Sequence, residues 1–319
     1  MSILAFEVQL SECYCLPLQQ KVKLPDAPLV FAGAFGGPFG IFIFTPLRNA
    51  LTLASQNSIA TAGELYLDVF AGGFASGWTG GMACVLPSSP QFIVMGPLFH
   101  LLKELLNSAV LAVVCCAIAE SCISYSSQTL NAQMAFNADQ ELAGSKDQVE
   151  LWNPFVPIGP GSSVHMLRSL AKTDRRGNFV ALSGLRVFSR PCQDVLAKAA
   201  NFLGLQLPQG PQEFFGDFIA SMGAAILSAP LNQLYNFSVT SNEFMGSGFV
   251  DKLILSRAYL VQTYLVFDLE GHVVSVSPTL CRDLFMRCAY IANLYALFGL
   301  IERLAVALWR RCHRSRLSN

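Results

Sequence analysis

Charged residues are scarce in this chain. Asp, Glu, Lys and Arg make up 13% of the 319 residues, with 21 of each sign, so the formal net charge is zero. An ordinary globular domain carries about 25% charged residues, so much of the surface of this chain is not expected to face water. The balanced charge provides no global basic field of the kind that attracts nucleic acid, and we expect no nucleic-acid partner.

Sequence patterns typical of catalysis, metal binding and secretion are also missing. There is no P-loop, no G-x-S-x-G nucleophile motif and no C-x-x-C pair, and the four histidines lack metal-ligand spacing. The N-terminus has neither the basic segment and apolar core of a secretory signal nor an arginine-rich transit pattern. We therefore predict no enzyme, no cofactor and no metal site, and interpret the ten cysteines as buried thiols that act as small apolar residues.

Long segments almost free of charge are what the chain has instead. A membrane-spanning helix needs about 20 mostly apolar residues. Four segments meet this length clearly, namely Ala27–Leu47, Val69–Leu102, Ser108–Ala138 and Phe218–Thr240. Two weaker ones are Val187–Leu207 and Leu280–Trp309. The pattern predicts an all-α membrane protein with six transmembrane helices, and both termini on one side because six is an even number.

Small residues recur at helical spacing within these segments. Two segments have a small residue at 6, 10 and 14 positions before a proline. Before Pro46 these are Gly40, Gly36 and Ala32, and before Pro230 they are Ala224, Ala220 and Gly216. Such ridges let helices approach closely in lipid, and each proline removes a backbone hydrogen bond near the helix end. A third segment has Ala112, Cys116 and Glu120 at the same offsets before Ser126. This recurrence predicts a threefold pseudo-repeat of two-helix units.

These ridges, prolines and following helices resemble the mitochondrial carrier family (solute carrier family 25). The best-matched stretch is "GWTGGMACVLPSSPQFIVMGPLFHLLKELL". The resemblance implies six helices in three pseudo-symmetric pairs around a central cavity, in the mitochondrial inner membrane. It divides the chain into an N-terminal segment (1–26), repeat 1 (27–106), repeat 2 (107–207, with an enlarged loop at 140–184), repeat 3 (208–308) and a basic tail (309–319). Short surface helices are expected after Arg48, within 140–184 and around 251–264.

The same resemblance implies two gates and a substrate site. In the family, acidic and basic residues after the three prolines form a ring of ion pairs. The matching pairs here are Arg48 with Leu51, Gln128 with Asn131, and Asn232 with Tyr235, none of them acidic. The opposite gate keeps His100 and Lys103 without a matching carboxylate. The predicted substrate contacts are Arg282, Gln91 and Ser88, while mutual pairing is the alternative explanation for Arg282, Asp283, Arg287 and Glu120.

Two functions remain open from the sequence. The first is a carrier-fold protein that no longer transports and serves as a structural subunit of an inner-membrane complex. Its partners would be other membrane subunits, reached through the 140–184 insertion and the basic tail. That tail also suits anionic lipid headgroups such as cardiolipin. The second is a working carrier for a neutral or weakly charged solute, gated by hydrogen bonds instead of ion pairs.

Overall fold

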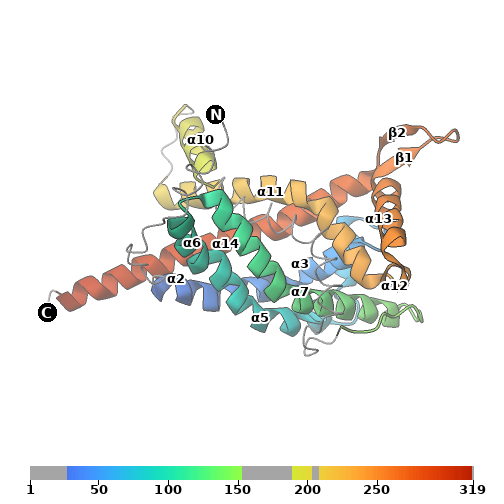
Figure 1. Ribbon diagram of the computed structural model, residues 1–319, viewed down its shortest axis with the longest axis horizontal. Helices are drawn as coiled ribbons and strands as arrows, with labels where there is room; N and C mark the ends of the chain where they lie inside the picture. The colour runs from blue at the N-terminus through green and yellow to red at the C-terminus, as the bar shows by residue number, and fades with distance from the viewer. Residues whose placement is uncertain (1–26, 153–188, 203–207, 318–319) are drawn as a thin grey trace, which may run out of the picture.

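The described chain is almost entirely helical (Figure 1). The computed structural model describes residues 27–152, 189–202 and 208–317. Its first half contains α2 (Ala27–Phe31), the π-helical turn η1 (Ala32–Gly36), α3 (Gly37–Ala54), α4 (Ala62–Asp68), the 3-10 turn η2 (Phe74–Trp78), α5 (Gly81–Ile93), the π-helical turn η3 (Val94–Leu98), α6 (Phe99–Leu106) and α7 (Ala109–Leu142). The second half contains α10 (Ser189–Phe202), α11 (Gln209–Thr240), α12 (Asn242–Gly246), α13 (Phe249–Tyr264), β1 (Leu265–Phe267), β2 (Val273–Val276) and α14 (Pro278–Leu317).

Four helices among the described residues are long and apolar enough to cross a membrane. They are Ala27–Ala54, Phe74–Leu106, Gly210–Thr240 and Pro278–Cys312. A fifth candidate is α7, whose two parts, Ala109–Glu120 and Cys122–Leu142, meet at an angle of 48°. The prediction of an all-α, multi-pass membrane architecture is therefore confirmed at this level. The predicted span Val187–Leu207 corresponds to α10, which has 14 residues and is shorter than the about 20 that a span needs.

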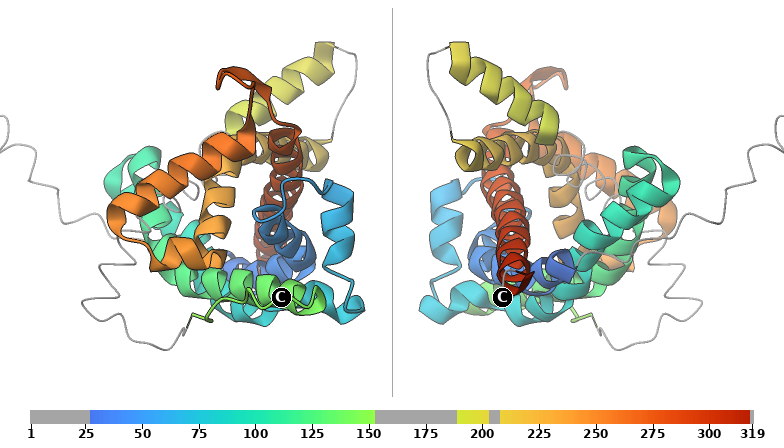
Figure 2. Two further views of the ribbon diagram at one scale, coloured as in Figure 1. Left: turned by 90° about the vertical axis from the view of Figure 1, so that its right-hand side faces the viewer. Right: turned by 90° about the vertical axis from the view of Figure 1, so that its left-hand side faces the viewer.

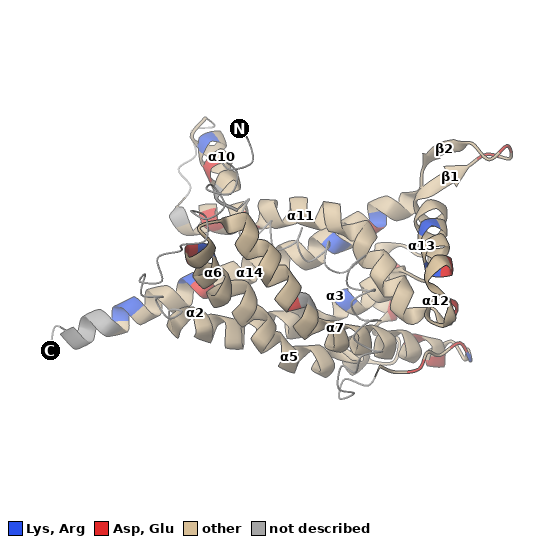
Figure 3. Ribbon diagram, in the orientation of Figure 1, with Lys and Arg blue, Asp and Glu red and all other residues tan. Residues whose placement is uncertain are grey.

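Side chains on the spans are arranged as expected for a protein in lipid. Phe31, Phe35 and Phe39 form an outward stripe on the first span and are 54–63% exposed. Polar side chains of the same helices point inward, so that Asn49 and Asp283 are each no more than 1% exposed. Figure 3 shows few charges along the middle of the bundle and more of them at its ends. Apolar outer faces and a polar interior fit a lipid surround better than water.

The helix directions follow from contacts between distant residues. Asn236 of α11 contacts Leu51 of α3, and Tyr235 of α11 contacts Thr129 of α7, so these three helices end together. We call this the hairpin end, because α13 and the β1–β2 hairpin also lie there (Figure 1). The spans lie side by side when viewed along the bundle, and α10 projects away from them (Figure 2).

Two helices run in the opposite direction and return the chain to the other end. Arg303, late in α14, pairs with Asp217, early in α11. Helix α5 is antiparallel to α3, since Gly37 faces Phe92 and Thr45 faces Gly81. The start of the first span and the end of α14 therefore lie at one end of the bundle (Figure 1). The prediction for the chain termini themselves involves residues 1–26, outside the described residues.

The predicted small-residue ridges lie at helix–helix contacts. A Cβ atom at Gly36 would lie 2.9 Å from the Ile301 side chain, and one at Gly40 would lie 2.9 Å from Leu294, both on α14. A Cβ atom at Gly216 would overlap Gln193 of α10. The other ridge positions, Ala32, Ala220 and Ala224, are buried. Glycine and alanine here let helix backbones approach closely.

Several expectations from the sequence need correction. The cysteine interpretation is wrong for Cys115, Cys122, Cys281 and Cys312, which are exposed, whereas Cys84 and Cys116 are buried. Helix α14 extends to Leu317, into the residues of the predicted basic tail. The β1–β2 hairpin was not expected, although the valine-rich stretch at 273–276 after the turn at Gly271 is a strand signal.

Surface helices appear at two of the three predicted places. Helix α4 follows the first span and begins with a capping box between Thr61 and Glu64, which satisfies its first backbone N–H groups. Helix α13 coincides with the predicted helix near 251–264. The helix predicted within the 140–184 insertion falls largely on 153–184, outside the described residues.

Candidate functional site

A polar network lies at the hairpin end of the bundle, where α3, α7 and the residues just before α5 meet. Asn131 donates from Nδ2 to Oδ1 of Asn49 at 3.1 Å and to the carbonyl of Thr79 at 3.1 Å. Asn49 in turn donates to the carbonyls of Gly77 and Thr79 at 3.1 and 3.0 Å. Both asparagines are buried. Together with the contacts of the next paragraph, we call this arrangement the amide network.

Helix α11 joins the amide network through hydroxyl and amide groups. Thr129 Oγ1 and Tyr235 OH are 2.8 Å apart, and Asn236 donates to the carbonyl of Leu51 at 3.2 Å. One helix turn further out, Gln133 donates to the carbonyl of Val239 at 3.1 Å. The three segments that follow Pro46, Ser126 and Pro230 thus meet through neutral hydrogen bonds, each worth about 1 kcal/mol net.

A left-handed glycine makes room for the amide network. Gly80 has φ of +70°, and a Cβ atom there would lie 2.8 Å from Asn131 Nδ2 and 3.1 Å from its Cα. Any other residue would be strained by this backbone conformation and would push α7 away from α5. The packing against Asn131 therefore explains why Gly80, the first glycine of "WTGG", is a glycine.

A cavity lies next to the amide network inside the bundle. Its empty volume is about 740 Å³, including space open to solvent. The charged and polar residues that line it are Arg48, Gln91, Glu120, Gln128, Asn232, Tyr235, Asn236, Arg287, Tyr290 and Tyr295. Apolar lining comes from Ile41, Leu51, Phe92, Leu231, Ile291 and Leu294. Such a mixture of apolar walls and convergent polar groups is typical of a small-molecule site.

Three charged side chains meet this cavity from three different helices. Arg48 of α3 donates from Nη1 to Cys84 Sγ at 2.8 Å and from Nη2 to the carbonyl of Gln128 at 3.5 Å. Glu120 of α7 accepts from Gln91 Nε2 at 2.6 Å. Arg287 of α14 lies over the ring of Tyr290, 5.8 Å from its centroid. Arg48 thus contributes to the cavity as well as to the predicted gate position.

The predicted substrate contacts separate in space. Gln91 lines the cavity. Ser88 is fully buried and donates to the carbonyl of Val85, within its own helix. Arg282 lies outside the cavity lining and donates to the carbonyls of Ala54, Asn57 and Ala60. The prediction that Arg282 and Ser88 contact substrate therefore finds no support in their positions, because their polar atoms bind the protein itself.

Arg282 is the centre of a structural cluster at the hairpin end. Its guanidinium also pairs with Asp283 at 2.9 Å, and Asp283 accepts from Tyr264 OH at 3.0 Å. Burial, and next the Asp283 carboxylate, raise the pKa of Tyr264 well above its usual range, so Tyr264 remains a hydrogen-bond donor. The carbonyl at Ala54 belongs to the C-terminus of α3, where a cation is favourable. Mutual pairing, the alternative given for this charge, is the arrangement observed.

The opposite end of the bundle holds ion pairs that the sequence reasoning missed. Arg303 of α14 pairs with Asp217 and, at 3.3 Å, with Glu213, both on α11. Gln193 of α10 donates to Asp217 at 3.1 Å. The uncharged segment predicted for this span begins at Phe218, directly after Asp217, so the prediction does not include this carboxylate. The sequence did contain a signal for this ion pair, because Asp217 directly follows the ridge position Gly216 and is therefore expected near a helix–helix contact.

The residues predicted for the opposite gate, His100 and Lys103, lie elsewhere. Both are on the exposed side of α6, with the imidazole of His100 against the ring of Phe99 at 5.4 Å between centroids. The ion pairs of Arg303 with Asp217 and Glu213 join α14 to α11 at this end instead.

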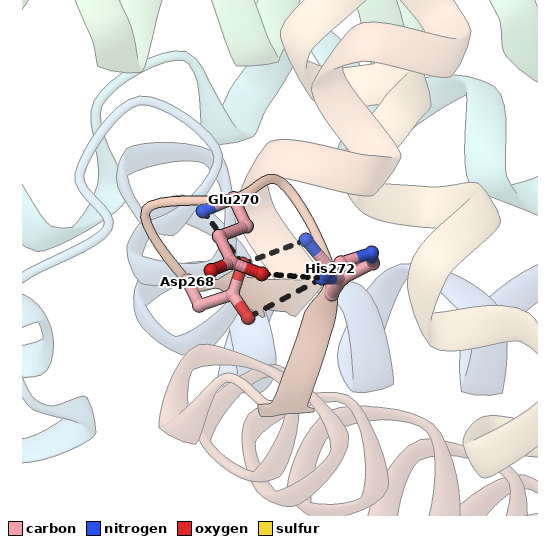
Figure 4. Close-up of side chains that lie close together, drawn as sticks. All are labelled: Asp268, Glu270 and His272. Atoms are coloured by element: carbon pink, nitrogen blue, oxygen red, sulfur yellow. Dashed lines mark hydrogen bonds and ion pairs between the residues drawn. The ribbon is translucent and has the colours of Figure 1, made fainter.

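A group of possible metal ligands lies at the tip of the β1–β2 hairpin (Figure 4). Ligand atoms of Asp268, Glu270 and His272 all lie within 4.8 Å of one another, and all three residues are exposed. Asp268 Oδ1 accepts from the backbone N–H groups of Glu270 and His272 at 3.0 and 2.8 Å. Because these bonds shape the turn before and after Gly271, the proximity is explained by the hairpin itself.

Comparison with known proteins adds no family to this description. No protein-family model matches the chain, and no curated protein matches it.

Proposed function

We propose that this chain is a carrier-like membrane protein that binds a small, neutral or weakly charged solute in its central cavity. The observation that carries the proposal is the convergence of two arginines, a glutamate and several amides on one space inside the bundle. Ionisable residues inside a membrane bundle are costly and typically mark a solute pathway. The amide network then closes the cavity toward the hairpin end by hydrogen bonds.

Six spans in three repeats remain part of this proposal, and the helix directions support them. Helix α7 ends at the hairpin end, whereas α11 starts at the other end, beside α10. A sixth crossing between α7 and α11 would complete three antiparallel pairs.

The amide network supports a threefold relation. Asn131 stands five residues after Ser126 and contacts Asn49, three residues after Pro46. Tyr235 stands five residues after Pro230 and contacts Thr129, three residues after Ser126. The same pair of offsets thus links neighbouring helices twice, as expected from a cyclic pseudo-repeat.

The mitochondrial inner membrane is the location that the carrier resemblance implies, and it is proposed on that ground alone.

Alternating access requires two closures, one on each side of the solute site, which form and break in turn. The amide network would supply one closure and the ion pairs of Arg303 with Asp217 and Glu213 the other.

Reconstitution of the purified full chain into liposomes tests this function. A panel of small solutes outside, with the same solutes trapped inside, should reveal saturable exchange of at least one of them. Arg48→Met should lower that exchange at least about tenfold, because it removes a cavity charge that a bound solute would contact, a loss of about 1.4 kcal/mol. Arg257→Met removes an exposed cation of α13 and should leave exchange unchanged. Absence of saturable exchange by the wild-type chain would reject the carrier function.

A structural subunit is the second candidate, and one feature favours it. The C-terminal part of α14 extends away from the other helices (Figure 1) and exposes Leu308, Trp309, Arg310 and Arg311. An apolar and basic helix end of this kind suits a neighbouring membrane subunit or anionic headgroups such as cardiolipin.

Native gel electrophoresis in mild detergent tests the subunit candidate. We expect the chain, if it is a subunit, to migrate with a large membrane complex, and Trp309→Ala with Leu308→Ala to release it. Migration at the size of the single 34.6 kDa chain plus its micelle would contradict the subunit candidate.

A further inference from the structure

Two prolines interrupt the backbone hydrogen bonds of the first span. Pro38 and Pro46 have no backbone N–H, so the carbonyls of Ala34 and Phe42, four residues earlier, lose their α-helical donors. Within a membrane no water replaces such a donor, and carbonyls freed in this way are satisfied by neighbouring helices or by local adjustment of the helix. A donor from another helix is therefore favourable at both places.

Two side chains of the following span, Phe74–Leu106, supply these donors. Trp78 donates from Nε1 to the carbonyl of Phe42 at 2.8 Å, and Ser89 donates from Oγ to the carbonyl of Ala34 at 2.7 Å. We infer that both are positioning residues, which replace the hydrogen bonds that the two prolines remove and so fix the shape of the first span. The accepting carbonyls are eight residues apart, about 12 Å at 1.5 Å per residue, so the span is held at two levels.

Residues 77–79 hold α3 on both sides of Pro46. The indole of Trp78 donates to the carbonyl four residues before the proline, and the carbonyls of the two flanking residues accept from Asn49, three residues after it. Because these contacts lie before and after the proline, they fix the direction in which α3 continues. Arg48, which lines the cavity, lies between the two attachment points, so residues 77–79 set where its side chain enters the cavity.

Aromatic neighbours keep the indole of Trp78 in this position. Its ring stacks on that of Phe42 at 5.8 Å between centroids, and the rings of Phe70 and Phe74 lie 6.1 and 5.0 Å from it. A Cβ atom at the neighbouring Gly77 would overlap the ring of Phe70, so this approach also requires a glycine. Because the surrounding rings already order the indole, little conformational entropy is lost when it donates its hydrogen bond.

A double-mutant cycle tests the role of Trp78 with the purified full chain in detergent. Trp78→Phe keeps an aromatic ring and removes the N–H, and Pro46→Ala restores a backbone N–H for the carbonyl of Phe42. In the wild-type background, Trp78→Phe should raise the equilibrium constant of unfolding about tenfold, equivalent to about 1.4 kcal/mol. In the Pro46→Ala background the increase should be about threefold or less, because the carbonyl then has its helical donor and only ring packing is lost.

The second bond provides an independent cycle and the controls. Ser89→Ala should raise the equilibrium constant of unfolding about threefold in the wild-type background and leave it nearly unchanged after Pro38→Ala. Exchanging the two alanine backgrounds between the cycles should give additive effects, because each restored N–H then reaches the other carbonyl. Ser238→Ala is the matched control and should have little effect, since this hydroxyl donates at 2.7 Å to a carbonyl of its own helix.

The outcomes decide this inference without any solute. Equal losses in the proline and alanine backgrounds would overturn it, because the two side chains would then contribute packing alone. If Trp78→Phe folds only after Pro46→Ala is added, the rescue supports the inference, and if it folds in neither background, the Ser89 cycle decides. Since both cycles measure unfolding, a chain that exchanges no solute would lose the proposed carrier function and keep this inference.

Discussion

Replacing Arg282 by methionine should destabilise the protein by about 3–5 kcal/mol, because it breaks a buried ion pair from one side. The Arg282 and Asp283 side chains are 7% and 0% exposed. Without the guanidinium, Asp283 would keep only neutral donors such as Tyr264, and the carbonyls of Ala54, Asn57 and Ala60 would lose their donor. Unfolding of the purified chain in detergent, followed by circular dichroism against temperature or denaturant, measures the loss.

Two further variants identify the cause of this loss. Arg282→Met combined with Asp283→Leu should recover part of the stability, since the unpaired buried carboxylate is then removed as well. Arg257→Met, an exposed arginine on α13, should change stability by less than about 0.5 kcal/mol. An Arg282→Met protein as stable as the wild type would show that the cluster does not hold α3 to α14.

The same arginine shows where the sequence reasoning stops. A charge in an apolar segment was correctly selected as significant, but the sequence gives no access to its partners. Those partners are backbone carbonyls at 54–60, more than 220 positions away. Backbone acceptors leave no signature in side-chain patterns, so a structural cation and a substrate-binding cation look alike in a sequence.

The spans were more predictable than their connections. A lack of charge over about 20 residues follows directly from the cost of placing charge in lipid, and it located three of the four spans and α7. The fourth span, Pro278–Cys312, was one of the two weaker predictions because charged residues interrupt it. Helix α10 was less predictable, since Arg190, Asp194 and Lys198 interrupt its apolar residues. The β1–β2 hairpin was not predicted, because its strands have only three and four residues and give a weak sequence signal.

The candidate site was predicted in part. Arg48, Gln128 and Tyr235, which were selected by counting from Pro46, Ser126 and Pro230, lie at one end of the bundle. It did not reveal that Asn49 and Thr129, one position beyond the family's charged positions, supply the partners in the amide network. Side-chain partners depend on helix rotation and depth, which the spacing along one helix does not determine.

Replacing Gly36 by leucine should destabilise the helix bundle by about 3 kcal/mol, an overpacking cost at the upper end of the usual range. The Cβ atom alone would lie 2.9 Å from Cγ2 of Ile301 and 3.3 Å from its Cδ1, before the rest of the side chain is added. Since α14 also meets Gly40 through Leu294, the two helices would have to separate over two contacts. We expect lower abundance in the membrane and a lower unfolding temperature in detergent, and a similar effect of leucine at the buried Ala220.

Gly223→Leu is the matched control for Gly36→Leu. Both glycines lie in membrane-spanning helices, but a Cβ atom at Gly223 would meet nothing within 4 Å. Leucine there adds apolar surface on the outer face and has a better helix propensity than glycine by up to about 1 kcal/mol. Stability should therefore be unchanged or slightly higher. If Gly36→Leu and Gly223→Leu proved equally stable, Gly36 would have to face lipid instead of Ile301, and the assignment of the ridge to the α3–α14 contact would be wrong.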